Sequence, residues 1–174
     1  MTWFLRNWTD VALALWQHIA ISLTALSIAF ALSLVIGIVT ARREKLYGAV
    51  MTVSGILYTI PTLAFLAFLI PVVGLGRTNA IITMVAFSLM ILIRSVATGI
   101  REVPAEVIDA ARGMGMNPAQ IMRRIELPLA LPLIVAGLRV SAVTVISVTV
   151  VAAYVNAGGL GTLIFNGIAI HPLR

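Results

Sequence analysis

Few side chains in this sequence could carry out acid–base or metal chemistry. The 174 residues include six acidic side chains, two histidines and no cysteine. The lack of cysteine excludes disulfides and thiolate metal sites, and His18 and His171 are far apart in sequence and make a poor metal pair. The acidic residues Glu102, Glu106 and Asp109 instead lie close together in a segment that also contains arginines. That segment is therefore the first candidate for a functional role.

The pattern of this segment predicts a short helix–turn–helix. Its first apolar residues recur at spacings of four, three and four, which places them on one helical face: Val103, Val107, Ala110 and Met114. The acidic residues come early, where the helix dipole favours negative charge. Gly113 and Gly115 are expected to end this helix, and Asn117 followed by Pro118 is typical of the start of the next one.

No nucleotide site is recognisable in the sequence. A phosphate-binding Walker loop requires G-x-x-x-x-G-K-[ST], whose lysine contacts the phosphates. The one lysine, Lys45, is preceded by Glu44 and followed by Leu46, so it belongs to no such loop. We therefore assign no catalytic residue and expect the chain to have no ATPase site of its own.

The composition indicates that the segment around Glu102, Glu106 and Asp109 is positioned by helices in a membrane. Hydrophobic residues make up 61% of the sequence and charged residues 10%, with a mean hydropathy of +1.10. A soluble domain carries about 25% charged residues because its surface faces water. Apolar side chains must therefore face lipid here. The net charge of +6 does not indicate nucleic acid, since most basic residues flank long apolar runs.

Long charge-free runs predict membrane spans. A helix needs about 20 apolar residues to cross the hydrocarbon. The run from Ile19 to Thr40 is of that length, and it is longer than a signal-peptide core of about 7–15 residues. We predict one transmembrane domain over residues 1–174, with spans at about 19–40, 47–72, 78–96 and 132–154. The second contains Pro61 and Pro71 and is expected to be one kinked or tilted span, whereas the Gly-rich segment 157–170 is too short to cross.

The distribution of basic residues predicts the orientation. Segments 42–45 and 101–127 carry most of the loop arginines, against Arg6 and Arg77 in the other loops. Basic loops stay in the cytoplasm, so the N-terminus is expected outside. Tryptophans precede the first span, where interfacial tryptophans are common: Trp3, Trp8 and Trp16. Two arginines near span ends are expected to extend to lipid headgroups: Arg94 and Arg139.

The pattern alone allows the 101–127 loop to be an inert connector or a DNA-reading helix–turn–helix. Both of its ends are tied to the membrane within a few residues, which disfavours DNA. Its residues are more specific: Asp109-Ala110-Ala111, three residues, Gly115, nine residues, then Ile125-Glu126-Leu127-Pro128. This spacing resembles the E-A-A, G, I-x-L-P signature of bacterial ABC-importer permeases, with Asp109 in place of glutamate.

In that family the loop docks into a groove of the ATPase subunit. The resemblance therefore implies an ATPase-coupling set in this sequence: Glu106, Asp109, Ala110, Ala111, Gly115, Ile125, Leu127 and Pro128. We expect the small Ala110 and Ala111 to allow close approach to the ATPase, and Gly115 to allow the sharp turn.

Three further motifs look like the permeases that import glycine betaine, carnitine and choline. They are Tyr58-Thr-Ile-Pro61-Thr-Leu-Ala, Ile70-Pro-Val-Val-Gly-Leu-Gly76 and Asn156-Ala-Gly-Gly-Leu-Gly161. The last also occurs in methionine-type permeases, and a tight turn after a span would explain it equally well. The candidates for a gate or pathway are Tyr58, Pro61, Gly158, Gly159 and Gly161. Aromatic faces hold quaternary amines, for which Tyr58 and Tyr154 are available.

The resemblance covers about residues 19–170 and implies an all-α fold, a polytopic transmembrane bundle of the MetI-like type I importer permeases. It implies an osmoprotectant permease subunit in the cytoplasmic membrane that holds no cofactor itself. Its expected partners are the lipid bilayer, an ATPase dimer that binds ATP and Mg, a second permease subunit and an extracytoplasmic binding protein. The family's final helix is expected to be absent after His171. The alternatives are a methionine-type permease and, from another class, an ion channel, a membrane enzyme or a scaffold.

Overall fold

A computed structural model describes residues 7–170, which contain helices and no strand. The predicted all-α class is therefore confirmed. In chain order the elements are α2 (Trp8–Ala41), α3 (Glu44–Thr59), α4 (Thr62–Val73), α5 (Arg77–Arg101), α6 (Ala105–Gly113), α7 (Pro118–Ile121), the π-helical η1 (Met122–Glu126), α8 (Leu127–Val151), the 3-10 helix η2 (Ala152–Val155) and α9 (Leu160–Ile170).

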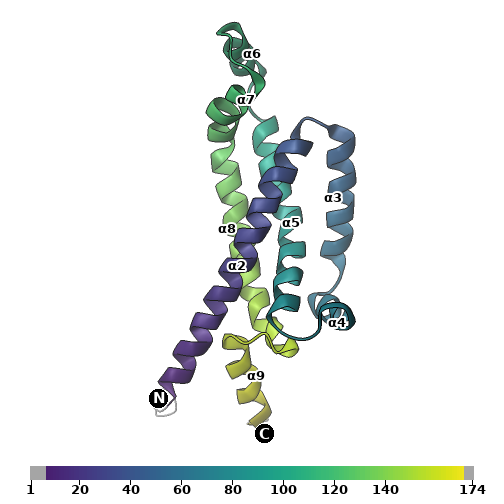
Figure 1. Cartoon of the computed structure of the whole chain (residues 1–174), viewed down its shortest axis with the longest axis vertical. Helices are drawn as coiled ribbons and strands as arrows, with labels where there is room; N and C mark the ends of the chain where they lie inside the picture. Colours follow the sequence, from purple (N-terminus) through teal and green to yellow (C-terminus); the bar gives the residue numbers. More distant parts are fainter. Residues whose placement is uncertain (1–6, 171–174) are drawn as a thin grey trace.

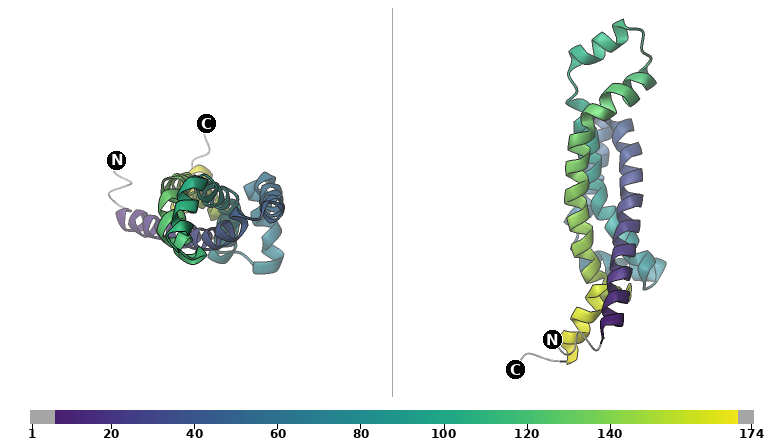
Figure 2. Two further views of the ribbon diagram at one scale, coloured as in Figure 1. Left: turned by 90° about the horizontal axis from the view of Figure 1, so that it is seen from above. Right: turned by 90° about the vertical axis from the view of Figure 1, so that its left-hand side faces the viewer.

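Three long helices, α2, α5 and α8, pack side by side along the length of the molecule (Figure 1). Helix α3 runs beside α5, and the hairpin of α6 and α7 projects beyond the bundle at one end, which we name the loop end (Figure 2). Helices α4 and α9 lie at the opposite end (Figure 1). Within residues 7–170, three helical stretches are long and apolar enough to cross a membrane, and the bent pair α3–α4 adds a fourth if it counts as one span.

Small residues allow the three long helices to approach closely. The buried side of α2 consists largely of alanine, serine and glycine, whereas large apolar side chains such as Leu23 and Val35 are exposed. A Cβ added to Gly37 would lie 2.6 Å from Val96, and one added to Gly137 would lie 2.1 Å from Ser95 Oγ. Lipid supplies no hydrophobic force between helices, so close packing of small residues and hydrogen bonds between helices hold them together.

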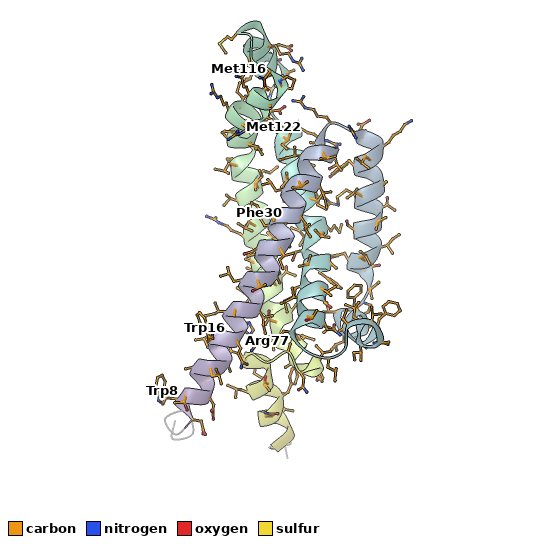
Figure 3. All side chains as sticks on the ribbon, viewed as in Figure 1. Trp8, Trp16, Phe30, Arg77, Met116 and Met122 are labelled. Atoms are coloured by element: carbon orange, nitrogen blue, oxygen red, sulfur yellow. The ribbon has the colours of Figure 1, made fainter. Side chains whose placement is uncertain are left out.

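The outer surface carries large apolar side chains along the whole bundle (Figure 3). Trp8 and Trp16 project from the far end of α2 and are exposed. Helix α2 begins at Trp8 rather than near Ile19, so both tryptophans lie on the helix itself. The charge-free run marks where apolar residues begin, and a helix can extend beyond it. Trp3 lies outside the described residues.

The segment 47–72, predicted as one kinked or tilted span, contains two helices. Helices α3 and α4 meet at 99°, with Ile60 and Pro61 in extended conformation between them. Proline has no N–H to donate and disfavours helical geometry at the residue before it. Pro71, in contrast, lies inside α4. Pro61 thus turns the chain across the end of the bundle before α5 returns it to the loop end (Figure 1).

Helices α5 and α8 are also longer than the predicted spans 78–96 and 132–154. Helix α5 continues to Arg101, so Arg94 lies within the helix, and α8 begins at Leu127. Proline is tolerated in the first turn of a helix because the N–H there has no helical partner, and Pro128 occupies that position. The side chains of Arg94 and Arg139 are exposed on the outside of α5 and α8.

Candidate coupling loop and gate

The 101–127 loop is a helical hairpin with a well-defined turn. Helix α6 ends at Gly113, and Asn117 caps α7 with Pro118 at its first position, as predicted. The Gln120 backbone N–H donates to Asn117 Oδ1 at 2.9 Å, and the Asn117 N–H donates to Gln120 Oε1 at 2.9 Å. This reciprocal pair is a capping box, which satisfies two N–H groups that the helix start leaves free.

Gly115 forms the turn between the two helices. Its φ is +79°, in the left-handed region that side chains rarely adopt, whereas the φ of Gly113 is not positive. The Met116 N–H donates to the Ala111 carbonyl at 3.1 Å and the Met114 N–H to the Ala110 carbonyl at 3.0 Å. These bonds close the end of α6. The role of Gly115 is to adopt the left-handed backbone conformation that the turn requires.

The candidate docking residues of α6 do not share one face. Glu106, Asp109 and Ala110 are exposed, whereas Ala111 is 0% exposed and packs within this chain. The expectation that both alanines allow close approach to a partner is therefore wrong for Ala111, because consecutive residues on a helix point in different directions. Asp109 Oδ1 also accepts a 3.1 Å hydrogen bond from Arg112, and both side chains are exposed.

Part of the apolar face of α6 is not covered by this chain. Val103 is buried, but Met114 is 71% exposed and Val107 is also exposed. The hairpin projects away from the bundle (Figure 2), so no other helix in the described part of the chain lies over its tip. Exposed apolar side chains at such a tip fit a surface that docks against another protein.

The returning arm of the loop contains a buried acidic residue outside the predicted ATPase-coupling set. Ile125 and Leu127 are partly buried and Pro128 is exposed, whereas Glu126, the variable position of the I-x-L-P motif, is 1% exposed. Its Oε1 accepts a hydrogen bond from Arg42 at the end of α2. The sequence signal for this pair is Glu126 itself, because an acidic residue beside an apolar span usually requires a basic partner.

The outgoing arm of the loop is attached to the same helix end. Arg101, the last residue of α5, donates from Nε to the Ala41 carbonyl at 2.7 Å and from Nη2 to the Thr40 carbonyl at 3.5 Å. Its guanidinium carbon lies 4.1 Å from the centre of the Tyr47 ring. Both arms of the loop therefore contact the last turn of α2.

The Gly-rich turn, residues 156–161, lies at the opposite end of the bundle. Asn156, Gly158 and Gly159 have positive φ values of 60°, 89° and 83°. A Cβ added to Gly161 would lie 2.0 Å from the Val150 carbonyl oxygen, so this glycine is needed for close approach. The turn therefore requires glycine for two different reasons, at Gly158 and Gly159 for conformation and at Gly161 for space.

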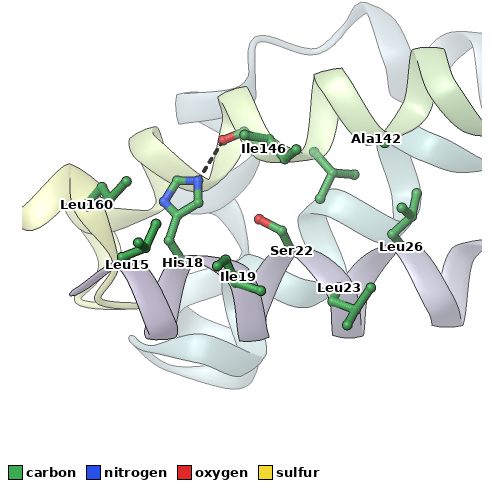
Figure 4. A pocket seen from close by; sticks show the side chains of 10 residues that line it. Leu15, His18, Ile19, Ser22, Leu23, Leu26, Ala142, Ile146 and Leu160 are labelled. Atoms are coloured by element: carbon green, nitrogen blue, oxygen red, sulfur yellow. Dashed lines mark hydrogen bonds between the residues drawn. The ribbon is translucent and has the colours of Figure 1, made fainter. Parts of the chain in front are cut away.

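Side chains of α2 hold this turn in place. Gln17 Oε1 accepts a 3.1 Å hydrogen bond from the Gly159 N–H. His18 is buried, and its Nε2 donates to the Ile146 carbonyl at 3.1 Å (Figure 4). His171 lies outside the described residues. No group of three or more histidine and acidic side chains gathers anywhere in residues 7–170 to hold a metal.

Beside His18, an apolar groove of about 310 Å³ runs between α2 and α8 (Figure 4). Ser22 hydrogen-bonds Thr149 at 2.8 Å close to this groove. The groove is lined by Leu15, His18, Ile19, Ser22, Leu23, Leu26, Ala142, Val145, Ile146 and Leu160.

The two tyrosines available for a cationic substrate lie in separate aromatic contacts. Tyr58, at the end of α3, has its ring centre 5.9 Å from that of Phe87. Phe65 of α4 meets Phe87 edge-on at 5.6 Å. Tyr154 instead packs against Phe165 of α9 at 4.3 Å. Pro61 lies beside the first group, at the bend between α3 and α4.

Comparison with known proteins identifies the family to which the chain belongs. The model of the family described as "binding-protein-dependent transport system inner membrane component" matches residues 33–173. The carnitine transport permease protein OpuCB of Listeria monocytogenes is 39% identical over 171 residues, which cover 98% of this chain and 78% of that protein. The choline transport system permease protein OpuBB of Bacillus subtilis (strain 168) is 37% identical over 156 residues, covering 90% and 72%.

Solved structures show the same fold. A chain in the inward facing structure of the MetNI methionine ABC transporter matches with a TM-score of 0.81 and 27% identity, covering 92% of this chain and 81% of that one. The predicted MetI-like permease fold is therefore confirmed. This chain belongs to the family of binding-protein-dependent transport system inner membrane components.

Proposed function

We propose that this chain is the permease subunit of an ATP-driven importer for a small quaternary amine such as glycine betaine, carnitine or choline. The observation that carries the proposal is the likeness to permeases named for these cargoes, at 33–39% identity over nearly the whole chain. The methionine transporter structures reach only 26–27%. The relatives therefore favour the osmoprotectant cargo over methionine.

The 101–127 loop is the proposed contact with the ATPase. Glu106, Asp109 and Ala110 are exposed on its projecting helix, and Met114 presents uncovered apolar surface. Closure of an ATP-loaded ATPase dimer would draw two such loops together. That movement would shift a pair of permeases from inward-facing to outward-facing, which is a change in the populations of two packings.

The Gly-rich turn and the α3–α4 bend are the proposed gate region. Both lie at the end of the bundle away from the loop (Figure 1), where a binding protein would deliver its cargo. Tyr58 lies next to the bend and offers an exposed aromatic face. Such faces attract quaternary ammonium groups without requiring a carboxylate.

The proposed orientation places the loop end in the cytoplasm and the N-terminus outside. Glu44 and Asn117 lie at the loop end and Thr78 at the other, and all three are exposed. Because the chain has no cysteine, single cysteines introduced at these positions report unambiguously. In intact cells, an impermeant thiol reagent is expected to label T78C but neither E44C nor N117C. Labelling of N117C from outside, with T78C protected, would reverse the orientation.

The cargo is tested by uptake into cells that carry the complete set of transporter genes and no other osmoprotectant importer. We expect saturable, ATP-dependent uptake of at least one of glycine betaine, carnitine and choline, and no comparable uptake of methionine. Cells without this permease gene are the control. Saturable uptake of methionine alone would assign the chain to the methionine-type permeases, and ion conductance without ATP would indicate a channel.

A further inference from the structure

The last turn of α2 is held from two sides by groups that no docking motif includes. Arg101 donates from Nε to the Ala41 carbonyl and, at the longer distance of 3.5 Å, from Nη2 to the Thr40 carbonyl, which also accepts the Arg43 N–H. The last carbonyls of a helix lack partners within the helix, so groups outside it can bind them. Glu126 binds the side chain of Arg42, the next residue. We name these three residues, Arg42, Arg101 and Glu126, the α2 clasp.

The Arg42–Glu126 contact is specific because Glu126 is buried. Glu126 is 1% exposed, and its Oε2 has no hydrogen-bond partner within the described part of the chain. Arg42 is therefore the group that compensates a buried carboxylate, while its own side chain remains 47% exposed. A buried charge that loses its one partner is strongly unfavourable. The loop is thus expected to keep this contact while it moves.

The position of Glu126 means that any movement of the loop would act on the Arg42–Glu126 contact. Glu126 ends the π-helical stretch Met122–Glu126, directly before α8. Arg101 ends α5, directly before the loop departs. The clasp therefore joins both roots of the loop to one helix. Displacement of the loop would pull on α2 as well as on α5 and α8.

Helix α2 extends from the clasp to the Gly-rich turn. From residue 17 to residue 42 it covers 25 positions, which correspond to about 38 Å at the usual rise per residue. In its N-terminal half Gln17 accepts from the Gly159 N–H, and His18 donates to the Ile146 carbonyl of α8. The same helix is thus bonded to the loop at its last turn and, through Gln17, to the Gly-rich turn. Figure 1 shows α2 running between these two ends of the bundle, and Figure 4 shows the His18–Ile146 bond.

We propose that the α2 clasp is a transmission contact that makes α2 move with the coupling loop and carries that movement to the Gly-rich turn. Arg42, Arg101 and Glu126 are positioning residues in this scheme, since none of them touches ATP or cargo. The inference rests on the proposed importer function. It goes beyond that function by assigning the mechanical connection to α2 and to an ion pair outside the docking face.

The test measures uptake and ATP hydrolysis in the same proteoliposomes, which contain the complete importer with its ATPase and binding protein. Arg42→Gln and Glu126→Gln are expected to retain the ATPase subunit and to hydrolyse ATP, but to lower cargo uptake per ATP by about tenfold, a typical coupling effect. Arg43→Gln is the matched control, because Arg43 is the adjacent, exposed arginine outside the clasp. It should leave the ratio unchanged.

The ratio of cargo uptake to ATP hydrolysis distinguishes transmission of movement from a purely structural role of the clasp. If the clasp only stabilised the fold, uptake, hydrolysis and ATPase retention would fall together and uptake per ATP would not change. That result, or an unchanged ratio with full activity, would overturn the inference. Glu126→Gln removes the buried charge and leaves Arg42 half exposed to solvent, so it keeps the test valid even if Arg42→Gln, which leaves that charge without its partner, does not fold. Wild-type uptake, measured in the same experiment, tests the proposed function separately.

A covalent connection should replace the ion pair. The chain has no cysteine, so a short bis-maleimide can join R42C to E126C within it. The joined protein is expected to recover most of the wild-type uptake per ATP, whereas the unjoined double variant should not. If joining the two residues leaves uptake per ATP at the level of the unjoined variant, the contact does not transmit movement.

Discussion

Gly115→Val is expected to abolish uptake and ATPase retention together. Gly115 has a φ of +79° at the turn of the 101–127 loop, and a β-branched residue there is a steric outlier. A side chain in the left-handed region costs about 1–2 kcal/mol or more, so the turn would reform in another conformation. We expect at least a tenfold loss of uptake, on the order of 1.4 kcal/mol of lost coupling. Co-purification of the ATPase and substrate-stimulated hydrolysis measure the effect.

Gly113→Ala is the matched control for this change. Gly113 ends α6 without a positive φ, and a Cβ added there meets nothing within 4 Å. Alanine should therefore be accepted with uptake close to wild type. If Gly115→Val inserts normally and still supports stimulated ATP hydrolysis, the loop is a connector and the proposed docking role fails.

Ala110→Glu is expected to release the ATPase while leaving the hairpin folded. Ala110 is exposed on the projecting helix, so a larger charged side chain there should change the free energy of unfolding by no more than about 0.5 kcal/mol. On a close docking face the same side chain would separate the two proteins. We expect at least a tenfold weaker association, about 1.4 kcal/mol, measured by titrating ATPase onto permease in nanodiscs.

Two variants identify the cause of that loss. Ala110→Ser keeps the side chain small and should bind the ATPase normally. Ala111→Glu should instead destabilise the hairpin, because Ala111 is 0% exposed within this chain and a buried carboxylate without a partner is costly. Normal ATPase binding by Ala110→Glu would move the docking surface away from this face of α6.

Sequence alone was sufficient for the class of fold and for the family. Long apolar runs predict membrane helices because lipid leaves backbone polar groups no other partner, and the spacing from Asp109 to Pro128 identifies the loop. The turn was also predictable in detail. Asn117, Pro118 and Gly115 act through their own backbone geometry, which depends on neighbouring residues and not on distant packing.

Tertiary structure decided which residues of that loop are exposed to a partner protein and which distant residues they bond within the chain. The motif treats Ala110 and Ala111 alike, but packing of the hairpin buries only Ala111. The bond between Arg42 and Glu126 joins residues 84 positions apart, and that between Gln17 and Gly159 joins residues 142 apart. No local pattern encodes such pairs, because they depend on how closely α2, α5 and α8 approach. Small residues such as Gly37 and Gly137 allow the helices to lie this close to each other, but their contacts exist only in the packed bundle.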